Sequence, residues 1–368
     1  MIGTDRLPPA RAAALRRRLL SWWRGASRDL PWRLPPGTTD PYRTWISEVM
    51  LQQTRVATVI PYYLRFLERW PTLEALAAAE PEEVLGAWSG LGYYARGRNL
   101  HAAAREAWKA HGGLPASPPE LARLPGFGPY TVGAVSSIAF GAALPAVDGN
   151  AVRVLSRLFA VEGEVRSGAG RARLEALARA LVPRRAPGDW NQALMELGAT
   201  LCRPRRPECH RCPLAGPCRA RLEGRTDELP SPRRRPRARR LEMALARVER
   251  GGRLLLVRRP GEGLLGGTWQ LPGTEVPPGG DPAAALRPVL RELGIRAAAG
   301  AELACVEREL SHRRLRLRVL RCAPPPGRVP GKPGRVRWTR PRDLTRLPLS
   351  TAMRRAIEAS APGMSGRS

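Results

Sequence analysis

Four cysteines in the middle of the chain are spaced closely enough to share one inorganic centre. They are Cys202, Cys209, Cys212 and Cys218, and prolines and arginines fill the segments between them. Thiolates are ligands of zinc and of iron–sulfur clusters rather than of oxygen-preferring cations. The spacing alone leaves these two open, and it disfavours disulfides in a chain without a secretion signal. The basic, proline-rich loop favours contact with phosphate over redox work.

Two carboxylates form a second candidate site. Glu48 lies on a predicted helix from Tyr42 to Thr58, where Gln52 and Arg55 share its stripe. If this apolar helix desolvates Glu48, its pKa rises and it becomes a general acid. The alternative is an exposed polar stripe.

Asp148 is the second carboxylate, in an Asp-Gly-Asn run just before the amphipathic segment 151–160. We expect Asn150 to cap that helix and the positive helix end to keep Asp148 ionised. A neutral acid beside an ionised carboxylate is the pair that cleaves glycosidic bonds. The alternative is a pair of capping residues without chemistry.

Two further features carry weaker signals. Gly126 and Gly128 stand between two short predicted helices, where exposed N–H groups bind a phosphate or simply make a turn. Glu196 lies opposite the apolar stripe of the predicted helix Trp190–Leu201, and it could read an amino group or be solvated.

The composition favours a nucleic-acid partner. The 368 residues include 62 Lys and Arg against 32 Asp and Glu, a formal net charge of +30. Such an imbalance attracts a polyanion. No apolar stretch approaches the length of a membrane span, so we expect a cytoplasmic protein without membrane contact.

The periodicity divides the chain into two predicted domains. Residues 10–225 carry apolar residues at three- and four-residue spacing, which predicts a mainly α domain. Residues 226–240 are rich in proline and arginine and predict a basic linker. Residues 241–360 predict a smaller α+β domain. Its expected elements are strands at Leu241–Val248, Arg253–Arg258, Ala304–Glu309 and Arg314–Leu320, and a helix at Asp281–Leu293.

Several runs of residues together resemble one family, the MutY-type adenine DNA glycosylases of the endonuclease-III-like helix–hairpin–helix superfamily. The resemblance covers nearly all of residues 10–225. The matching runs are Leu30–Arg33, Trp45–Thr54, Gly90–Arg96, Leu124–Thr131, Asp148–Asn150, Met195–Gly198 and the cysteine spacing.

The resemblance implies a function and a role for each site. The cysteines would hold a [4Fe–4S] cluster, Glu48 would protonate adenine, and Asp148 would stabilise or attack the sugar cation. The substrate would be double-stranded DNA with adenine opposite 8-oxoguanine or guanine, bound by a monomer. The other implied roles are positioning of Asp148 by Tyr130 and Asn150, an adenine pocket of Trp32, Arg33 and Glu196, and a duplex wedge of Gln52, Leu91 and Tyr93.

Tyr130 also indicates a subclass. Bifunctional relatives place a lysine there, which attacks the sugar as a Schiff-base nucleophile. This chain lacks that lysine, so the resemblance implies base removal without efficient cutting of the DNA strand.

The second predicted domain resembles the family's Nudix-like C-terminal domain. Pro288 and Arg291 stand where the Nudix box carries carboxylates, so we expect recognition rather than Mg²⁺-assisted hydrolysis. Ser311 and His312 match the loop that inspects oxidised guanine, with Leu310 in place of a phenylalanine. The alternatives are a glycosylase of different base preference, a non-catalytic iron–sulfur DNA-binding protein and a nucleotide hydrolase.

Overall fold

The computed structural model describes residues 7–361 except 36–37, 166, 232–238, 262, 264, 297, 311–312 and 330–333. The chain forms two compact units. The first contains Met1–Ala77 and Ala102–Arg234, and the second contains Ala78–His101 and Arg235–Ser368. Within the described residues, no helix is both long and apolar enough to cross a membrane.

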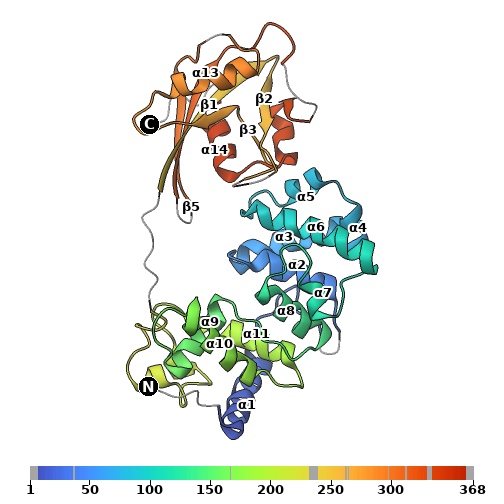
Figure 1. Cartoon of the computed structure of the whole chain (residues 1–368), viewed down its shortest axis with the longest axis vertical. Helices are drawn as coiled ribbons and strands as arrows, with labels where there is room; N and C mark the ends of the chain where they lie inside the picture. Colours follow the sequence, from blue (N-terminus) through green and yellow to red (C-terminus); the bar gives the residue numbers. More distant parts are fainter. Residues whose placement is uncertain are drawn as a thin grey trace. The chain divides into compact units, whose positions relative to one another are not determined.

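The first unit is helical (Figure 1). The predicted helices at 151–160 and Trp190–Leu201 are present. The helices are α1 Pro9–Ala26, α2 Pro41–Leu51, α3 Val56–Arg69, α4 Leu73–Ala78, α6 Tyr94–His111, α7 Pro118–Leu121, α8 Pro129–Phe140, α9 Gly149–Phe159, α10 Gly168–Leu181, α11 Pro187–Thr200 and α12 Arg219–Leu222, where α4 and α6 run across the boundary between the units.

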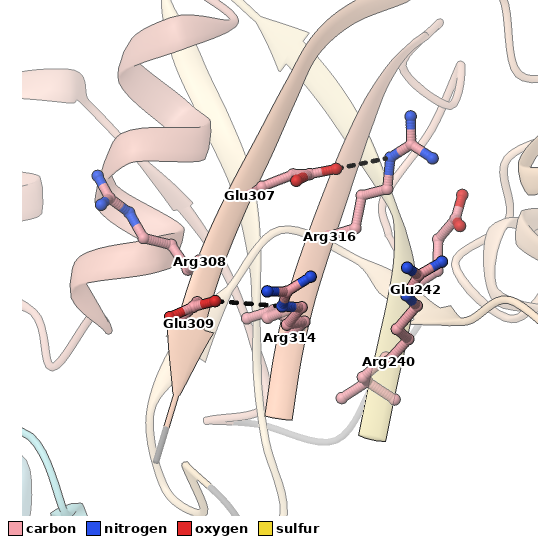
Figure 2. A pocket seen from close by; sticks show the side chains of 9 residues that line it. Arg240, Glu242, Glu307, Arg308, Glu309, Arg314 and Arg316 are labelled. Carbon is pink, nitrogen blue, oxygen red and sulfur yellow. Dashed lines mark hydrogen bonds and ion pairs between the residues drawn. The ribbon is translucent and has the colours of Figure 1, made fainter. Parts of the chain in front are cut away.

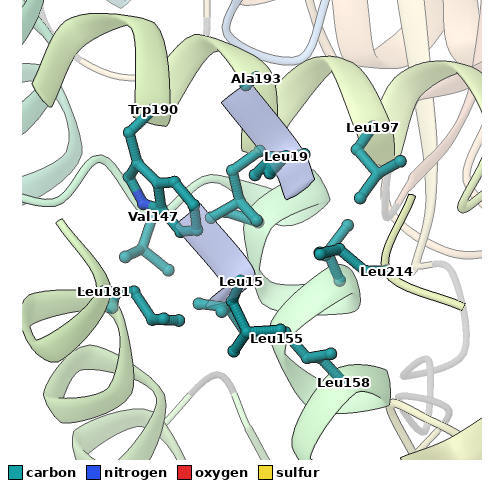
Figure 3. Close-up of a cluster of buried hydrophobic side chains, with 14 of the residues drawn as sticks. Leu15, Leu19, Val147, Leu155, Leu158, Leu181, Trp190, Ala193, Leu197 and Leu214 are labelled. Atoms are coloured by element: carbon teal, nitrogen blue, oxygen red, sulfur yellow. The ribbon is translucent and has the colours of Figure 1, made fainter. Parts of the chain in front are cut away.

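One large apolar core holds the α1, α9, α10 and α11 region together. Leu15 and Leu19 of α1 meet Leu155 of α9 and Trp190 of α11 there (Figure 3). All four are at most 2% exposed. Burying a large apolar side chain contributes about 1.5–3 kcal/mol, so this packing holds α1, α9 and α11 against one another.

The predicted single helix Tyr42–Thr58 is wrong. The helix α2 ends at Leu51, Gln53 adopts a left-handed φ of 58°, and Arg55 precedes α3 in extended conformation. A left-handed residue breaks the helical repeat. Gln52 and Arg55 therefore do not continue the stripe that starts at Glu48.

The second unit contains a mixed sheet in the order β3-β2-β1-β6-β5, with β4 on β1 and β7 on β2. The predicted strands and helix are confirmed, whereas β3, β4, β7 and α14 were not predicted. The elements are α5 Pro81–Ala87, β1 Arg239–Arg250, β2 Arg253–Arg258, β3 Trp269–Gln270, β4 Gly273–Glu275, α13 Pro282–Glu292, β5 Glu302–Leu310, β6 Arg313–Cys322, β7 Val336–Thr339 and α14 Thr351–Ala359.

Two helices cover opposite faces of this sheet. Leu245 of β1 packs in the cluster that contains α14, whereas its neighbours Ala244 and Ala246 pack in the cluster that contains α13. Alternate residues of a strand point to opposite faces, so β1 is buried on both sides and is apolar there.

Beyond the apolar part, β1, β5 and β6 carry a ladder of paired charges (Figure 2). Arg314 lies 3.1 Å from Glu309, and Arg316 lies 3.6 Å from Glu307. Side chains of opposite charge on neighbouring strands form ion pairs with one another.

Candidate active site and cysteine loop

Glu48 lies in the buried middle of α2. Its side chain is only 6% exposed, and burial raises its pKa to about 7. The Tyr130 hydroxyl donates a hydrogen bond to Glu48 Oε2, which opposes that rise, while the charge of Asp148 adds to it. Glu48 is thus a carboxyl group that holds its proton near neutral pH, and the exposed-stripe alternative is wrong.

Tyr130 comes from the first turn of α8, directly after Pro129. Burial, followed by the charges of Glu48 and Asp148, raises the pKa of its hydroxyl well above the usual value. The hydroxyl therefore keeps its proton near neutral pH and acts as a hydrogen-bond donor. Its oxygen also lies 3.4 Å from Met195 Sδ of α11, so α2, α8 and α11 meet at this group.

Asp148, rather than Asn150, is the N-cap of α9. Its Oδ1 accepts the Ala151 N–H at 2.7 Å, and its Oδ2 accepts from Asn150 Nδ2 at 2.8 Å. Burial raises the pKa of Asp148, and these two donors and Arg153 oppose the rise. Asp148 accepts hydrogen bonds from Asn150 and Ala151, whereas Glu48 accepts one from Tyr130, so the hydrogen bonding favours the ionised form of Asp148 more than that of Glu48.

Arg153 is a contributor that the sequence pattern did not reveal. Its Nη2 donates to Asn150 Oδ1 at 2.8 Å and to Gly198 O at 2.7 Å, and its Nε donates to Cys202 O at 2.7 Å. The Arg153 guanidinium therefore connects Asn150, the hydrogen-bond partner of Asp148, to Cys202, the first of the four cysteines. The only indication in the sequence is that Arg153 follows Asn150 by three residues, a spacing that brings two side chains together on a helix.

Glu196 is buried, so the solvated alternative is wrong. Arg28 binds it in a bidentate pair at 2.5 and 2.7 Å, and Arg33 Nη2 lies 2.8 Å from Oε2. Burial alone would raise the pKa of Glu196, but the two arginines outweigh it and lower the pKa. Arg28 was also not predicted. The third predicted pocket residue, Trp32, packs edge-on to Tyr63 with ring centroids 5.4 Å apart.

The helix–hairpin–helix predicted around the two glycines consists of α7, its turn and α8. Gly126 has a φ of 79°, and Gly128 is the N-cap of α8 without a side-chain cap. The first N–H groups of α8 therefore have no capping side chain, as anion binding requires. Gln52 Nε2 donates to Thr131 Oγ1 at 3.0 Å, which joins the end of α2 to this hairpin.

The predicted wedge residues of the second unit differ in exposure. Tyr93 is 45% exposed and has a φ of 49°, a strained value for a residue with a side chain. Leu91 is buried, with 5% exposed. Ser311 and His312 lie outside the described residues.

The four cysteines lie around η1, a short 3-10 helix at Cys209–Arg211, and are partly buried and unbonded to one another. Arg157 lies beneath this loop, 2% exposed, and donates to Cys202 Sγ at 3.3 Å and to Arg203 O at 2.7 Å. In the described part of the chain, no group of three or more His, Cys, Asp or Glu is arranged as a metal site.

The donor chemistry of this loop nevertheless fits a thiolate-bound cluster. Burial, with a further contribution from the charges of the other three cysteines, raises the pKa of Cys212 to about 12. Cys202 Sγ and Cys218 Sγ both contact Arg157, at 3.3 Å from its Nη1 and at 3.5 Å from its backbone oxygen. Only a cation among them would hold all four as thiolates.

Comparisons with known proteins show the family of the chain. Residues 46–207 match the model of the HhH-GPD superfamily of base excision DNA repair proteins, and residues 243–359 match that of the NUDIX domain. An adenine DNA glycosylase of Mycolicibacterium smegmatis is 44% identical over 207 residues, which are 56% of this chain and 69% of that protein. The chain belongs to the adenine DNA glycosylase family of the HhH-GPD superfamily.

The family assignment confirms the predicted resemblance and fold class. The adenine DNA glycosylase of Rattus norvegicus is 41% identical over 321 residues, which are 74% of this chain and 62% of that protein. The chain thus spans about three fifths of this relative's length. A thermostable thymine-DNA glycosylase of known structure is 30% identical, with a TM-score of 0.51, over 58% of this chain and 97% of that one.

Proposed function

We propose that this chain is a monofunctional DNA glycosylase of base excision repair. It would hydrolyse the N-glycosidic bond of adenine paired with 8-oxoguanine or guanine in double-stranded DNA. The observation that supports this most is a pair of interacting carboxyls, in which buried Glu48 has a pKa of about 7 and half-buried Asp148 is hydrogen-bonded. A proton donor next to an anion is what cleavage of a glycosidic bond requires.

In the proposed reaction, the C–N bond breaks and its electron pair leaves with adenine. Glu48 gives its proton to the adenine ring, so the leaving group departs without a negative charge. Asp148 stabilises the positive sugar or attacks it, and water then supplies the hydroxyl. The proton of that water returns to Glu48. Tyr130 orients Glu48 through its hydrogen bond, and Asn150 orients Asp148.

The adenine must leave the base stack to reach these groups, since a stacked base is inaccessible. We assign Trp32, Arg33 and Glu196 to the pocket that receives it. Glu196 Oε2 accepts from both Arg28 and Arg33, whereas Oε1 accepts from Arg28 alone, so Oε1 keeps one lone pair for the adenine amino group. Gln52, Leu91 and Tyr93 are assigned to the wedge, and Gly126 and Gly128 to a backbone phosphate.

The cysteine loop is proposed to hold a [4Fe–4S] cluster. Cys202, Cys209, Cys212 and Cys218 would be its ligands, and Arg157 would donate a hydrogen bond to Cys202. The cluster would supply structural order to a basic loop rather than take part in bond cleavage.

The second unit is proposed to inspect the opposite strand through Ser311 and His312 instead of hydrolysing nucleotides. Pro288 and Arg291 of α13 occupy positions where hydrolysis would need carboxylates. The domain bounds 10–225, 226–240 and 241–360, the monomeric state and the cytoplasmic location stay predictions.

One assay tests the function. Duplexes with adenine opposite 8-oxoguanine, adenine opposite guanine and thymine opposite guanine are incubated with the protein, and strand breaks are scored with and without alkali. We expect alkali-dependent breaks at adenine alone. The likeness to a thymine-DNA glycosylase makes thymine the second candidate base, and breaks only at thymine would replace our proposal with that one.

A further inference from the structure

The position of Asp148 depends on a segment that has no regular secondary structure. Residues 141–148 connect the end of α8 to the start of α9 and form neither helix nor strand. A Cβ atom added to Gly133 of α8 would collide with Pro145 O, so the segment runs back along α8 in close backbone contact. This course brings the chain from the end of α8 towards its first turn, which carries Tyr130.

One side chain gives this segment the hydrogen bonds that a neighbouring strand would give it in a sheet. Asn191 Nδ2 of α11 donates to Leu144 O at 2.8 Å, and Asn191 Oδ1 accepts the Ala146 N–H at 3.1 Å. The amide thus bonds to the backbone on both sides of Pro145, as a paired strand does. Buried backbone groups need such partners, because an unpaired group destabilises the arrangement that buries it.

The Asn191 amide is itself fixed in one orientation. It is 1% exposed, and its Nδ2 also donates to Ser137 Oγ of α8 at 2.8 Å. Rotating the amide by half a turn would bring two donors together at Ala146 and two acceptors together at Leu144, so only the observed orientation satisfies both backbone groups. Ser137 Oγ in turn donates to Ala134 O at 3.2 Å, so Asn191 joins α8, α11 and the segment.

The helix that carries Asn191 also contacts the chain beyond Asp148. A Cβ atom added to Gly198 of α11 would lie 2.6 Å from Asn150 Cβ, so the start of α9 packs directly against the α11 backbone. Asn191 and Gly198 are seven residues apart, which is about two turns of a helix, so both lie on the same face of α11. A single helix therefore holds the chain on both sides of Asp148.

We propose that Asn191 positions Asp148 for cleavage of the glycosidic bond, a role that rests on the function proposed above. Asn191 acts through the backbone of residues 144–146, which leads to Asp148 two residues later. Misplacing a catalytic group by about 1 Å costs about a hundredfold in rate. Loss of the two backbone hydrogen bonds therefore slows base removal while the side chains that contact DNA stay the same.

Binding of two uncleavable duplexes by the full chain tests this role. One duplex carries a pyrrolidine in place of the deoxyadenosine, and the other carries a tetrahydrofuran. The pyrrolidine is positively charged at neutral pH and mimics the sugar as the bond breaks, whereas the tetrahydrofuran is neutral. An ionised Asp148 beside the sugar strengthens binding of the cation alone. We expect the wild type to prefer the pyrrolidine duplex, and Asp148→Asn to lose this preference.

Asn191→Leu keeps the approximate size of the side chain and removes its hydrogen bonds. It should reduce the preference for the pyrrolidine duplex about tenfold and slow single-turnover base removal about ten- to a hundredfold. Its affinity for the tetrahydrofuran duplex should stay close to that of the wild type. Ser156→Ala is the matched control, because Ser156 Oγ is also buried and donates to Val152 O at 2.7 Å within α9. This control should leave the preference and the rate unchanged.

Circular dichroism under the assay conditions confirms that each variant is folded. If Asn191→Leu does not fold, Ser137→Ala takes its place, since it removes the acceptor that orients the Asn191 amide and should reduce the preference in the same direction. The proposal is overturned if the folded variant keeps the wild-type preference, even where base removal is slower, because a purely structural role lowers the rate alone. A wild type without any preference would instead contradict the proposed role of Asp148, and the role of Asn191 with it, so the two failures are distinguishable.

Discussion

Because the pKa of Glu48 is high, we predict that ionisation of this residue lowers the stability of the folded protein above neutral pH. Glu48→Gln should remove this loss of stability. The folded-state pKa is about 7, against an ordinary value of 4.5. Between these two pH values the folded protein holds a proton that the unfolded chain has lost, so stability falls as pH rises through this window. A difference of about 2.5 in pKa corresponds to about 3 kcal/mol, because one pKa unit is worth about 1.4 kcal/mol.

Glutamine cannot ionise, and its amide oxygen can still accept from the Tyr130 hydroxyl. We therefore expect Glu48→Gln to be more stable than the wild type at pH 8 by about 2–3 kcal/mol, with most of this gain absent at pH 5. Urea unfolding at both pH values, followed by near-UV circular dichroism, measures the difference. Glu68→Gln, at an exposed position of α3, is the control and should show no such pH dependence. Equal stability gains at pH 5 and pH 8 would refute the assigned pKa.

Three further predictions concern the proposed chemistry and recognition. Asp148→Asn should slow single-turnover base removal by at least about a hundredfold while leaving DNA binding intact, and near wild-type rates would remove Asp148 from the mechanism. Protein purified without oxygen should be brown, with roughly four irons and four sulfides per chain. Stoichiometric zinc in protein from iron-replete cells would refute the assignment of an iron–sulfur cluster. Cys209→Ser should reduce the iron content and the DNA affinity more than it reduces the rate of bond cleavage. Ser311→Ala with His312→Ala should reduce the preference for adenine opposite 8-oxoguanine over adenine opposite guanine by about ten- to a hundredfold, as measured by single-turnover rates on the two duplexes, and an unchanged ratio would exclude these residues from recognition.

Much of the fold could be predicted from local pattern. The amphipathic spacing of Leu155 and Leu158 predicted α9. The apolar run Arg253–Arg258 predicted β2 with its observed bounds. Short elements such as β3, a strand of two residues, carry too little periodicity to be seen. The break after Leu51 was missed because a left-handed glutamine has no signature in composition.

The candidate site was harder to predict, since burial and pairing depend on distant segments. The structure brings Glu48, Asp148 and Tyr130 into one site, but the sequence could not show that Asp148 itself caps α9. Arg28 and Glu196 are 168 residues apart, and no local pattern connects them. Arg153 of α9 reaches the carbonyls of Gly198 and Cys202 only after α9 and α11 have packed together.

Release of free adenine as a function of pH tests the central claim most directly. The measurement uses single-turnover conditions, a duplex with adenine opposite 8-oxoguanine, and chromatography of the free base from pH 5.5 to pH 9. We predict release that falls about tenfold per pH unit above pH 7, as Glu48 loses the proton it must donate, and no release by Glu48→Gln. A rate that stays constant above pH 7, or adenine release by Glu48→Gln at the wild-type rate, would contradict the account.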